Sequence, residues 1–292
     1  MQRERHSRTA DSTTIFRALE SSRPESDRIC YDPFARKFLG TFLGFLNGNR
    51  VVSKVMFRLF VKEGFVMQVY GDIVARTRYI DDRLTESSDR IGQLVILGAG
   101  FDSRAYRFPA LKAHVFELDH PAMLDLKKAK VKKELGSLPP NVTYVPIDFD
   151  SERLDELLLS TAYDPDAVTF FTWEGVTMYL SADAVDETLA FVREHSAPGS
   201  TIVFNYVFRS VVEGTSDFRG AKEWVSRLER VGESPTFGIE EGTVEKFLSD
   251  RGFGEIESPD YVRLAEGYFA QAGRRLDVAH FIGLASGTVC DR

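Results

Sequence analysis

From residue 93 onward, short and continuous apolar runs alternate with stretches of helical periodicity, and this alternation constrains the fold more than any other feature. Apolar runs that lack polar alternation are typical of parallel strands covered by helices on both faces. The sequence therefore predicts an α/β fold with a doubly wound, Rossmann-like sheet. The predicted strands are residues 93–97, 113–118, 141–147, 167–172 and 200–207, with a late strand at 278–285 expected at a sheet edge.

Helices are expected between these strands and before them. In the core, the helical pieces are residues 121–135, 151–159 and 182–194, followed by a short helix at 241–248. The first ninety residues are predicted to form a helical region that packs on the core. In that region, Ser12–Thr14 is expected to cap one helix, Pro33 to occupy the first position of a second, and residues 71–84 to form a third. This divides the chain into a helical region, 1–90, and a core, 91–292.

Residues 208–240 interrupt the alternation directly after the fifth predicted strand. The segment contains Phe218, Trp224 and Phe237, and Tyr206 and Phe208 come just before it. An insertion at the carboxyl end of a strand is well placed to cover a ligand, and its aromatic rings fit a flat apolar one. Simple packing is the alternative for these rings. The sequence predicts a segment that covers the substrate.

Composition limits the partners of the chain. It has 44 acidic and 37 basic side chains, a net charge of −7, and this average repels a phosphate backbone. A small-molecule partner is therefore expected rather than nucleic acid. Cys30 and Cys290 are too far apart in sequence for a CxxC site, and we expect two reduced thiols in a cytoplasmic protein. No run of about 18 uncharged apolar residues predicts a membrane span.

A glycine turn gives the first signal of a ligand. The strand 93–97 leads directly into Gly98, Ala99 and Gly100, where small residues let the backbone approach a ligand at the carboxyl edge of the sheet. A dinucleotide fingerprint would have a third glycine where Ser103 stands. The turn therefore indicates a ligand, but not a pyrophosphate in particular.

Acidic residues follow the next three strands. Asp119 lies nineteen residues after Gly100, where a carboxylate can accept both hydroxyls of a ribose. Asp148 can accept an exocyclic adenine amine while the ring of Phe149 packs on the base, and Glu174 follows the fourth strand. Acids at successive strand ends suit a nucleoside linked to a cation, which S-adenosylmethionine provides, better than they suit a pyrophosphate.

Four motifs together carry a resemblance to a known family. They are Arg76-Thr-Arg-Tyr-Ile-Asp-Asp82, Gly98-Ala-Gly-Phe-Asp-Ser-Arg104, Phe116-Glu-Leu-Asp-His-Pro121 and Trp173-Glu-Gly-Val-Thr-Met-Tyr-Leu180. The chain resembles the leucine carboxyl methyltransferase family over nearly its whole length. It is more similar to the bacterial branch, with its polyketide carboxyl methyltransferases such as the tetracenomycin enzyme, than to the eukaryotic phosphatase-modifying enzyme.

The resemblance implies a class I methyltransferase fold that uses S-adenosylmethionine. It implies that Arg76 and Arg17 hold the methionine carboxylate and that Glu174 binds the amino-acid end. The resemblance also implies that Gly98 faces the cofactor, that Asp119 takes the ribose hydroxyls and that Asp148 and Phe149 take the adenine. Ser103 stands where the family often has threonine, which is a conservative departure.

The residue types also bear on the chemistry of transfer. A carboxylic acid is already ionised at pH 7 and needs no base, whereas a phenol benefits from one. None of the five histidines is placed as a base, so a carboxylate acceptor is predicted, with no catalytic residue assigned and no metal motif. Hydroxyl methylation, a nicotinamide-dependent dehydrogenase and a non-catalytic binding protein remain as alternatives. Arg78, Arg104 and Arg107 are expected to form salt bridges or to bind substrate.

Overall fold

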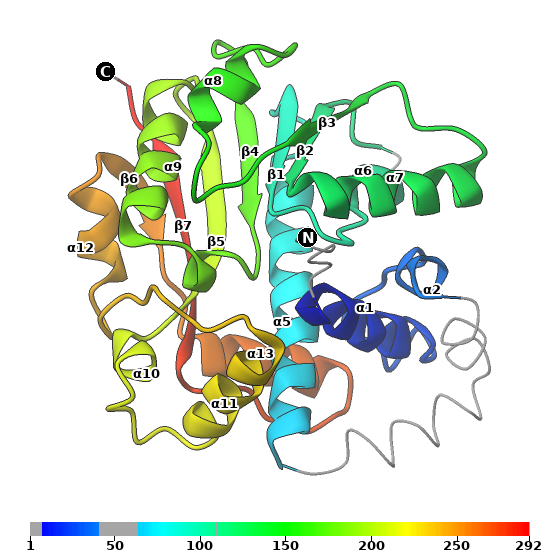
Figure 1. The fold of residues 1–292 in the computed structure, drawn as a ribbon. Coiled ribbons are helices and arrows are strands. Elements are labelled where there is room, and N and C mark those ends of the chain that lie inside the picture. Colours follow the sequence, from blue (N-terminus) through cyan, green and yellow to red (C-terminus); the bar gives the residue numbers. More distant parts are fainter. Residues whose placement is uncertain (1–7, 41–63, 109, 292) are drawn as a thin grey trace.

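The computed structural model describes residues 8–40, 64–108 and 110–291. In this part of the chain, seven strands form one sheet in the order β3-β2-β1-β4-β5-β7-β6 (Figure 1). The predicted α/β fold and its five core strands are confirmed, with boundaries shifted by at most two residues. The strands are β1 (Gln93–Leu97), β2 (His114–Asp119), β3 (Val142–Pro146), β4 (Thr169–Trp173), β5 (Thr201–Val207), β6 (Phe253–Glu257) and β7 (Ile282–Val289).

Strands β1 to β5 are parallel, as their apolar character predicts. Every residue of β1 is buried, and Leu97 at its end stands opposite Leu118 of β2. The strand order reverses beside β1, which has β2 on one side and β4 on the other. In open sheets of this kind, the crevice outside the carboxyl ends at the reversal is the usual ligand site.

The last strand differs from the prediction. It spans Ile282–Val289, not 278–285, and lies between β5 and β6 rather than at an edge, antiparallel to both. Residues before it pack on a helix instead, since the Ala279 N–H donates to Asp72 at 3.0 Å.

The edge strand itself, β6, was not predicted. It has only two apolar side chains in five residues, too few to stand out in the sequence, and its pairing is irregular between Gly254 and Glu257. Glu255, with φ +43°, lies in that irregular stretch.

Helices cover both faces of the sheet, and α7 and α9 have the predicted bounds. The helix predicted at 71–84 is longer, and α13 was not predicted. Residues 41–63 of the predicted helical region lie outside the described residues, and the division at residue 90 stays a prediction. The helices are α1 (Arg8–Ser21), α2 (Ala35–Phe38), α5 (Gly64–Ser87), α6 (Arg104–Arg107), α7 (Pro121–Leu135), α8 (Leu154–Leu159), α9 (Ala182–Glu194), α10 (Arg209–Val212), α11 (Ala221–Val231), α12 (Val244–Ser249) and α13 (Tyr261–Gln271), with a 3-10 turn, η1 (Thr177–Tyr179).

Two predicted helix starts were wrong. Helix α1 begins before Ser12, because the hydroxyls of Thr13 and Thr14 donate back to the Ala10 carbonyl and so fit inside a helix. Pro33 does not open the second helix, which begins at residue 35. The Asp32 carboxylate accepts the two N–H groups that follow Pro33 and holds this turn.

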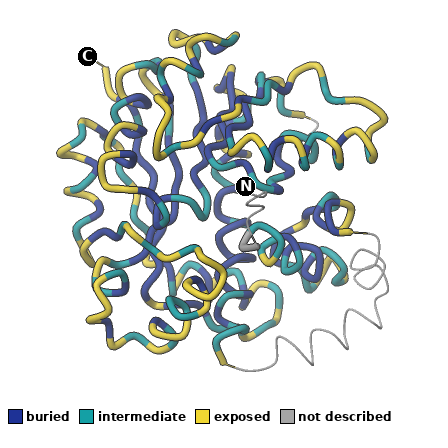
Figure 2. The backbone as a smooth tube through the Cα atoms, in the orientation of Figure 1, coloured by how far each residue is buried: buried dark blue, intermediate teal, exposed yellow. Residues whose placement is uncertain are grey.

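Two apolar layers enclose the sheet. One contains α5 and α13 and the other contains α8, α9 and α12, and Figure 2 shows the buried strands between more exposed helices. The segment 208–240 forms α10 and α11 after β5 and returns to the sheet through a bridge between Phe208 and Ile239. Among the described residues, no helix has the length and apolar character needed to span a bilayer.

Candidate active site

A cavity of about 1680 Å³ lies at the carboxyl ends of the parallel strands. All nine residues predicted to bind the cofactor line it, although they come from six separate segments of the chain. The sheet thus brings together what the sequence predicted at successive strand ends. The nine are Arg17, Arg76, Gly98, Ala99, Gly100, Asp119, Asp148, Phe149 and Glu174.

The glycine turn after β1 has the backbone that only glycine adopts readily. Gly98 and Gly100 have φ values of +67° and +40°. A Cβ on Gly98 would lie 2.2 Å from Cγ2 of Val176, which also lines the cavity. Both conformation and space therefore require glycine at position 98.

A buried ion pair supports this turn from below. Lys127 of α7 donates to Glu117 at 2.8 Å and to the Ala99 carbonyl at 3.2 Å, and both charged side chains are fully buried. Tyr106 donates to the same carboxylate at 3.0 Å. Burial raises the pKa of Glu117 to about 7, with Lys127 opposing the shift. This pair ties β2 and α7 to the cavity floor.

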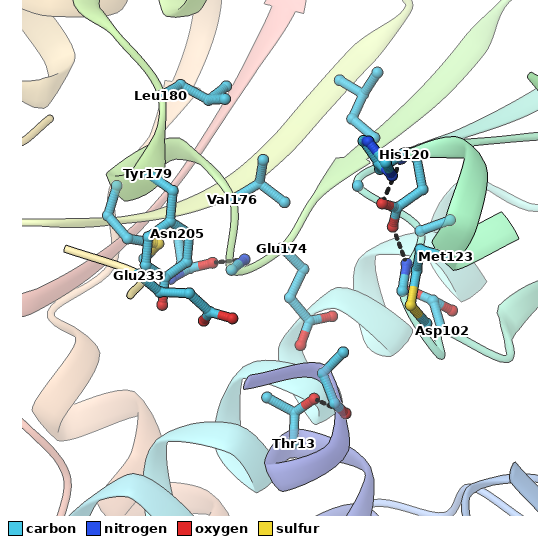
Figure 3. Close-up of a pocket in the computed structure, with 18 of the residues that line it drawn as sticks. Thr13, Asp102, His120, Met123, Glu174, Val176, Tyr179, Leu180, Asn205 and Glu233 are labelled. Atoms are coloured by element: carbon cyan, nitrogen blue, oxygen red, sulfur yellow. Dashed lines mark hydrogen bonds between the residues drawn. The ribbon is translucent and has the colours of Figure 1, made fainter. Parts of the chain in front are cut away.

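Asp119 closes β2 and holds the turn from the side. One of its oxygens accepts the Gly100 N–H and the other the His120 N–H, both at 2.6 Å (Figure 3). Burial raises the pKa of Asp119, and the two backbone donors act against that shift. His120 also starts α7, where its Nδ1 accepts the Ala122 N–H at 3.3 Å. The carboxylate is thus fixed in direction before any ligand binds.

Glu174 lines the cavity, and in the close-up it lies between Tyr179 on one side and His120 on the other (Figure 3). Its two oxygens accept from Arg76 Nε and Arg104 Nη1, each at 2.8 Å. Burial alone would raise the pKa of Glu174, but Arg76 and Arg104 outweigh it and lower the pKa well below the ordinary value. Glu174 is therefore an ionised carboxylate in this site.

Arg104 connects three acids beneath the cavity. It is only 1% exposed and pairs with Asp81 at 2.9 Å, with Asp102 and with Glu174. Arg107 pairs with Asp81 at 2.6 Å, and Arg78 pairs with an acid one turn along α5. Of the two interpretations of these three arginines, the salt-bridge one is confirmed.

The other predicted residues differ in exposure and in how many of their polar atoms are already hydrogen-bonded within the protein. Arg17 donates to Asp32 and to the Phe101 carbonyl, each at 2.8 Å, so much of its guanidinium is held by the protein. Asp148 is exposed, and one of its oxygens accepts the Asp150 N–H at 3.2 Å. Phe149 is partly buried against the α8–α9 layer.

Three features of the cavity escaped the sequence analysis. Asn205 is a fully buried amide within β5, and its Oδ1 accepts the Gly175 N–H at 2.7 Å, which shapes the loop carrying Glu174. Asp72 of α5 lines the cavity one turn before Arg76, as do residues 229–234 at the end of α11 and directly after it. A polar residue inside an apolar strand was the one signal that could have pointed to Asn205.

Most aromatic side chains near residues 208–240 pack rather than line the cavity. Trp224 does line it, but the rings of Phe208 and Phe218 pack against each other with centroids 5.6 Å apart. Phe237 packs against Phe247. The packing alternative is correct for these rings, and the cavity is less aromatic than the sequence suggested.

The comparisons with known proteins identify the family. Residues 10–193 match the family model described as leucine carboxyl methyltransferase. The chain belongs to this family. The predicted resemblance is thereby confirmed, and the chain is an S-adenosylmethionine-dependent methyltransferase.

Relatives agree with this assignment. The chain is 31% identical to a candidate S-adenosyl-L-methionine-dependent methyltransferase of Streptomyces coelicolor, over 75% of this chain and 77% of that protein. It is 36% identical to one of Bacillus subtilis, but that match spans only 43% of this chain and 42% of the relative. The names of these two relatives favour a methyltransferase over the nicotinamide-dependent dehydrogenase considered above.

Solved structures support the fold. A candidate methyltransferase from Thermobifida fusca superposes with a TM-score of 0.54 at 17% identity, covering 94% of this chain and 97% of that one. A Haemonchus contortus phosphoethanolamine N-methyltransferase, solved with S-adenosylhomocysteine, superposes with a TM-score of 0.51 at 13% identity, over 87% of this chain and 61% of that one. The fold of this chain is thus similar to the folds of these two proteins.

Proposed function

We propose that this enzyme transfers the methyl group of S-adenosylmethionine to a carboxylate oxygen of a small molecule. The observation that carries the proposal is the convergence of nine predicted residues on one cavity in a chain of the leucine carboxyl methyltransferase family. At about 1680 Å³ the cavity exceeds the usual range for a single small ligand, roughly 300–1,000 Å³, and so supports room for cofactor and acceptor together.

The residues present fit S-adenosylmethionine. Gly98 and Val176, which both line the cavity, lie this close only because Gly98 has no Cβ, and the fixed Asp119 carboxylate retains lone pairs for ribose hydroxyls. We assign adenine to Asp148 and Phe149. Glu174 and Arg76 are assigned to the amino and carboxylate groups of the methionine part, with Arg17 in support.

The chemistry follows from these positions. When bound, S-adenosylmethionine supplies a methyl group on a positively charged sulfur. An acceptor oxygen forms a bond to the methyl carbon while the carbon–sulfur bond breaks and its electron pair stays on sulfur. A carboxylate acceptor carries no proton to be removed, so the protein's main task is alignment, which can contribute about 7–11 kcal/mol in the best cases.

The acceptor is assigned to the side of the cavity near α11. Thr236 donates its N–H to the Met178 carbonyl and its hydroxyl to the Leu180 carbonyl, each at 2.8 Å, which holds the end of the 208–240 segment against the cavity wall. This supports the role of the segment as a substrate cover. Arg230 lines the same side and is a cation suited to an acidic acceptor. We further propose a polyketide or another secondary metabolite as acceptor, and a cytoplasmic enzyme.

The reaction is tested by its product. We expect the protein to methylate members of a panel of aromatic carboxylic acids when given radiolabelled S-adenosylmethionine. The ester formed releases its label in mild alkali, whereas a methyl ether does not. Alkali-stable label, or label only on phenols, would overturn the carboxylate assignment. Calorimetry with S-adenosylmethionine and with NAD tests the cofactor separately, and we expect heat only with the first.

Adding one methyl group at Gly98, and the same group at a glycine outside the cavity, should distinguish an effect on cofactor binding from backbone strain alone. We expect Gly98→Ala to lower stability and to reduce cofactor affinity at least tenfold, because the new Cβ would collide with Val176 and push the turn into the cavity. Gly136→Ala is the matched control, with φ +82° and open space around its Cβ. Both changes carry about 1–2 kcal/mol of backbone strain, but only the first should affect binding. Equal affinity of the two variants in calorimetry would contradict this role.

A further inference from the structure

A buried acid lies in the part of the cavity that the cofactor roles leave unused. Asp72 is 4% exposed and lines the cavity from α5. Side chains of α5, α11 and β7 line the same cavity, and we call this group the acceptor lobe. Its members are Val69, Asp72, Ile73, Trp224 and Ile282.

The acceptor lobe is held together by contacts between these elements. The Trp224 ring packs against Phe281, next to Ile282, with centroids 5.8 Å apart. Near the start of α11, a Cβ on Gly220 would lie 2.6 Å from the Gln68 side chain of α5. The lobe is thus a largely apolar surface with one acid in it.

Asp72 has no ion pair among the residues that the structure describes. One carboxylate oxygen accepts the Ala279 N–H at 3.0 Å, and the Tyr261 hydroxyl donates to the Asp72 main-chain carbonyl at 2.9 Å. The charged groups that act on it are Arg76 on its own helix and Asp277 on the segment before β7. Arg76 is engaged by Glu174, and Asp277 pairs with an arginine.

These surroundings favour the neutral acid. Burial raises the pKa of Asp72 well above its ordinary value, and the Ala279 N–H, Arg76 and the Tyr261 hydroxyl offset only part of that shift. A buried carboxylate without a paired cation takes up a proton rather than remain charged in an apolar site. A protonated carboxyl group can then donate one hydrogen bond.

We propose that Asp72, as the neutral acid, donates a hydrogen bond to one oxygen of the acceptor's carboxylate and so directs the other oxygen to the methyl group. This rests on the proposed function, because it requires an anionic acceptor. An ionised Asp72 would repel such an acceptor. The opposite role, an ionised Asp72 that takes the proton of a hydroxyl acceptor, makes opposite predictions.

The test compares two substitutions at one position. Asparagine keeps a donor of similar size, whereas alanine removes it. With the best carboxylic acid of the panel, we expect Asp72→Ala to lower kcat/KM about 10–100-fold and Asp72→Asn to stay within about threefold of the unmodified enzyme. The unmodified enzyme should lose activity as the pH rises through the pKa of Asp72, and Asp72→Asn should lack that decline. Glu86→Ala, an exposed acid on α5, is the control.

A binding measurement keeps this test independent of turnover. Benzoate is titrated into each protein saturated with S-adenosylhomocysteine, from pH 6 to 9, and thermal unfolding checks that each variant folds. We expect the benzoate affinities of the unmodified enzyme and its variants to follow the same order and the same pH dependence as their kcat/KM values. If Asp72→Asn is as impaired as Asp72→Ala, or activity rises with pH, the inference is overturned. If label is transferred only to phenols while benzoate binds as expected, the proposed reaction fails together with the directing role of Asp72, and only its hydrogen bond to a bound carboxylate stands.

Discussion

Replacing Asp119 with alanine should weaken the binding of S-adenosylmethionine about 100-fold. The carboxylate is fixed by the Gly100 and His120 N–H groups, so both of its oxygens are aimed before the ligand arrives. A hydrogen bond to a charged group contributes about 1.5–3 kcal/mol, and two ribose hydroxyls would together lose roughly 3 kcal/mol, or a factor of about 100. Calorimetry with S-adenosylmethionine and with S-adenosylhomocysteine measures the loss directly.

The control for this variant lies on the neighbouring helix. Asp125 of α7 has a side chain that is 74% exposed and pairs with Lys128 outside the cavity. Asp125→Ala should leave cofactor affinity unchanged. An affinity of Asp119→Ala within threefold of the unmodified enzyme would show that the ribose assignment is wrong.

Arg104→Met should be the most destabilising substitution in the charged cluster beneath the cavity. It leaves Asp81 with Arg107 and Glu174 with Arg76, but it removes the cation that pairs with Asp102. Removing one partner of a buried ion pair costs about 3–5 kcal/mol of unfolding free energy. Chemical denaturation measures this difference. Arg227→Met, which breaks a half-exposed pair with Glu223, should cost no more than about 0.5 kcal/mol.

The pH dependence of this variant distinguishes electrostatics from packing. Arg104 lowers the pKa of Asp102 against the effect of burial, and with Arg76 it lowers that of Glu174. A carboxyl group whose folded pKa is depressed contributes stability above its unfolded pKa, near 4, and that stability is lost as the pH falls. The difference in unfolding free energy between the unmodified enzyme and Arg104→Met should therefore be largest at neutral pH and should decrease below about pH 4. A difference that does not change with pH would mean that the variant loses stability through packing.

The sequence predicted the site better than it predicted the partners within the site. Asp119 and Glu174 could be located because each follows an apolar run, and parallel strands bring their carboxyl ends to one edge. No local pattern indicated that Arg104 would reach Glu174, seventy positions away, or that Arg17 would turn to Asp32. These contacts depend on how helices dock, which periodicity does not specify.

The same limit explains the errors in the fold. Buried residues such as Val278 gave the appearance of a strand, although this stretch packs on α5 and the strand begins at Ile282. Asp72 was passed over because an acid on a helix is usually solvated. That position is interior because Ala279, just before β7, and Tyr261 of α13 both hydrogen-bond to Asp72.

The irregular pairing of β6 has a consequence for the self-association of this enzyme. A long, flat edge strand offers unpaired backbone groups to a neighbouring chain. In this enzyme the edge strand β6 is short, is irregular near Glu255 and carries two glutamates. The opposite edge strand, β3, ends at Pro146, which has no N–H to donate. We therefore expect any self-association to use helical surfaces, and the sheet to resist extension into aggregates.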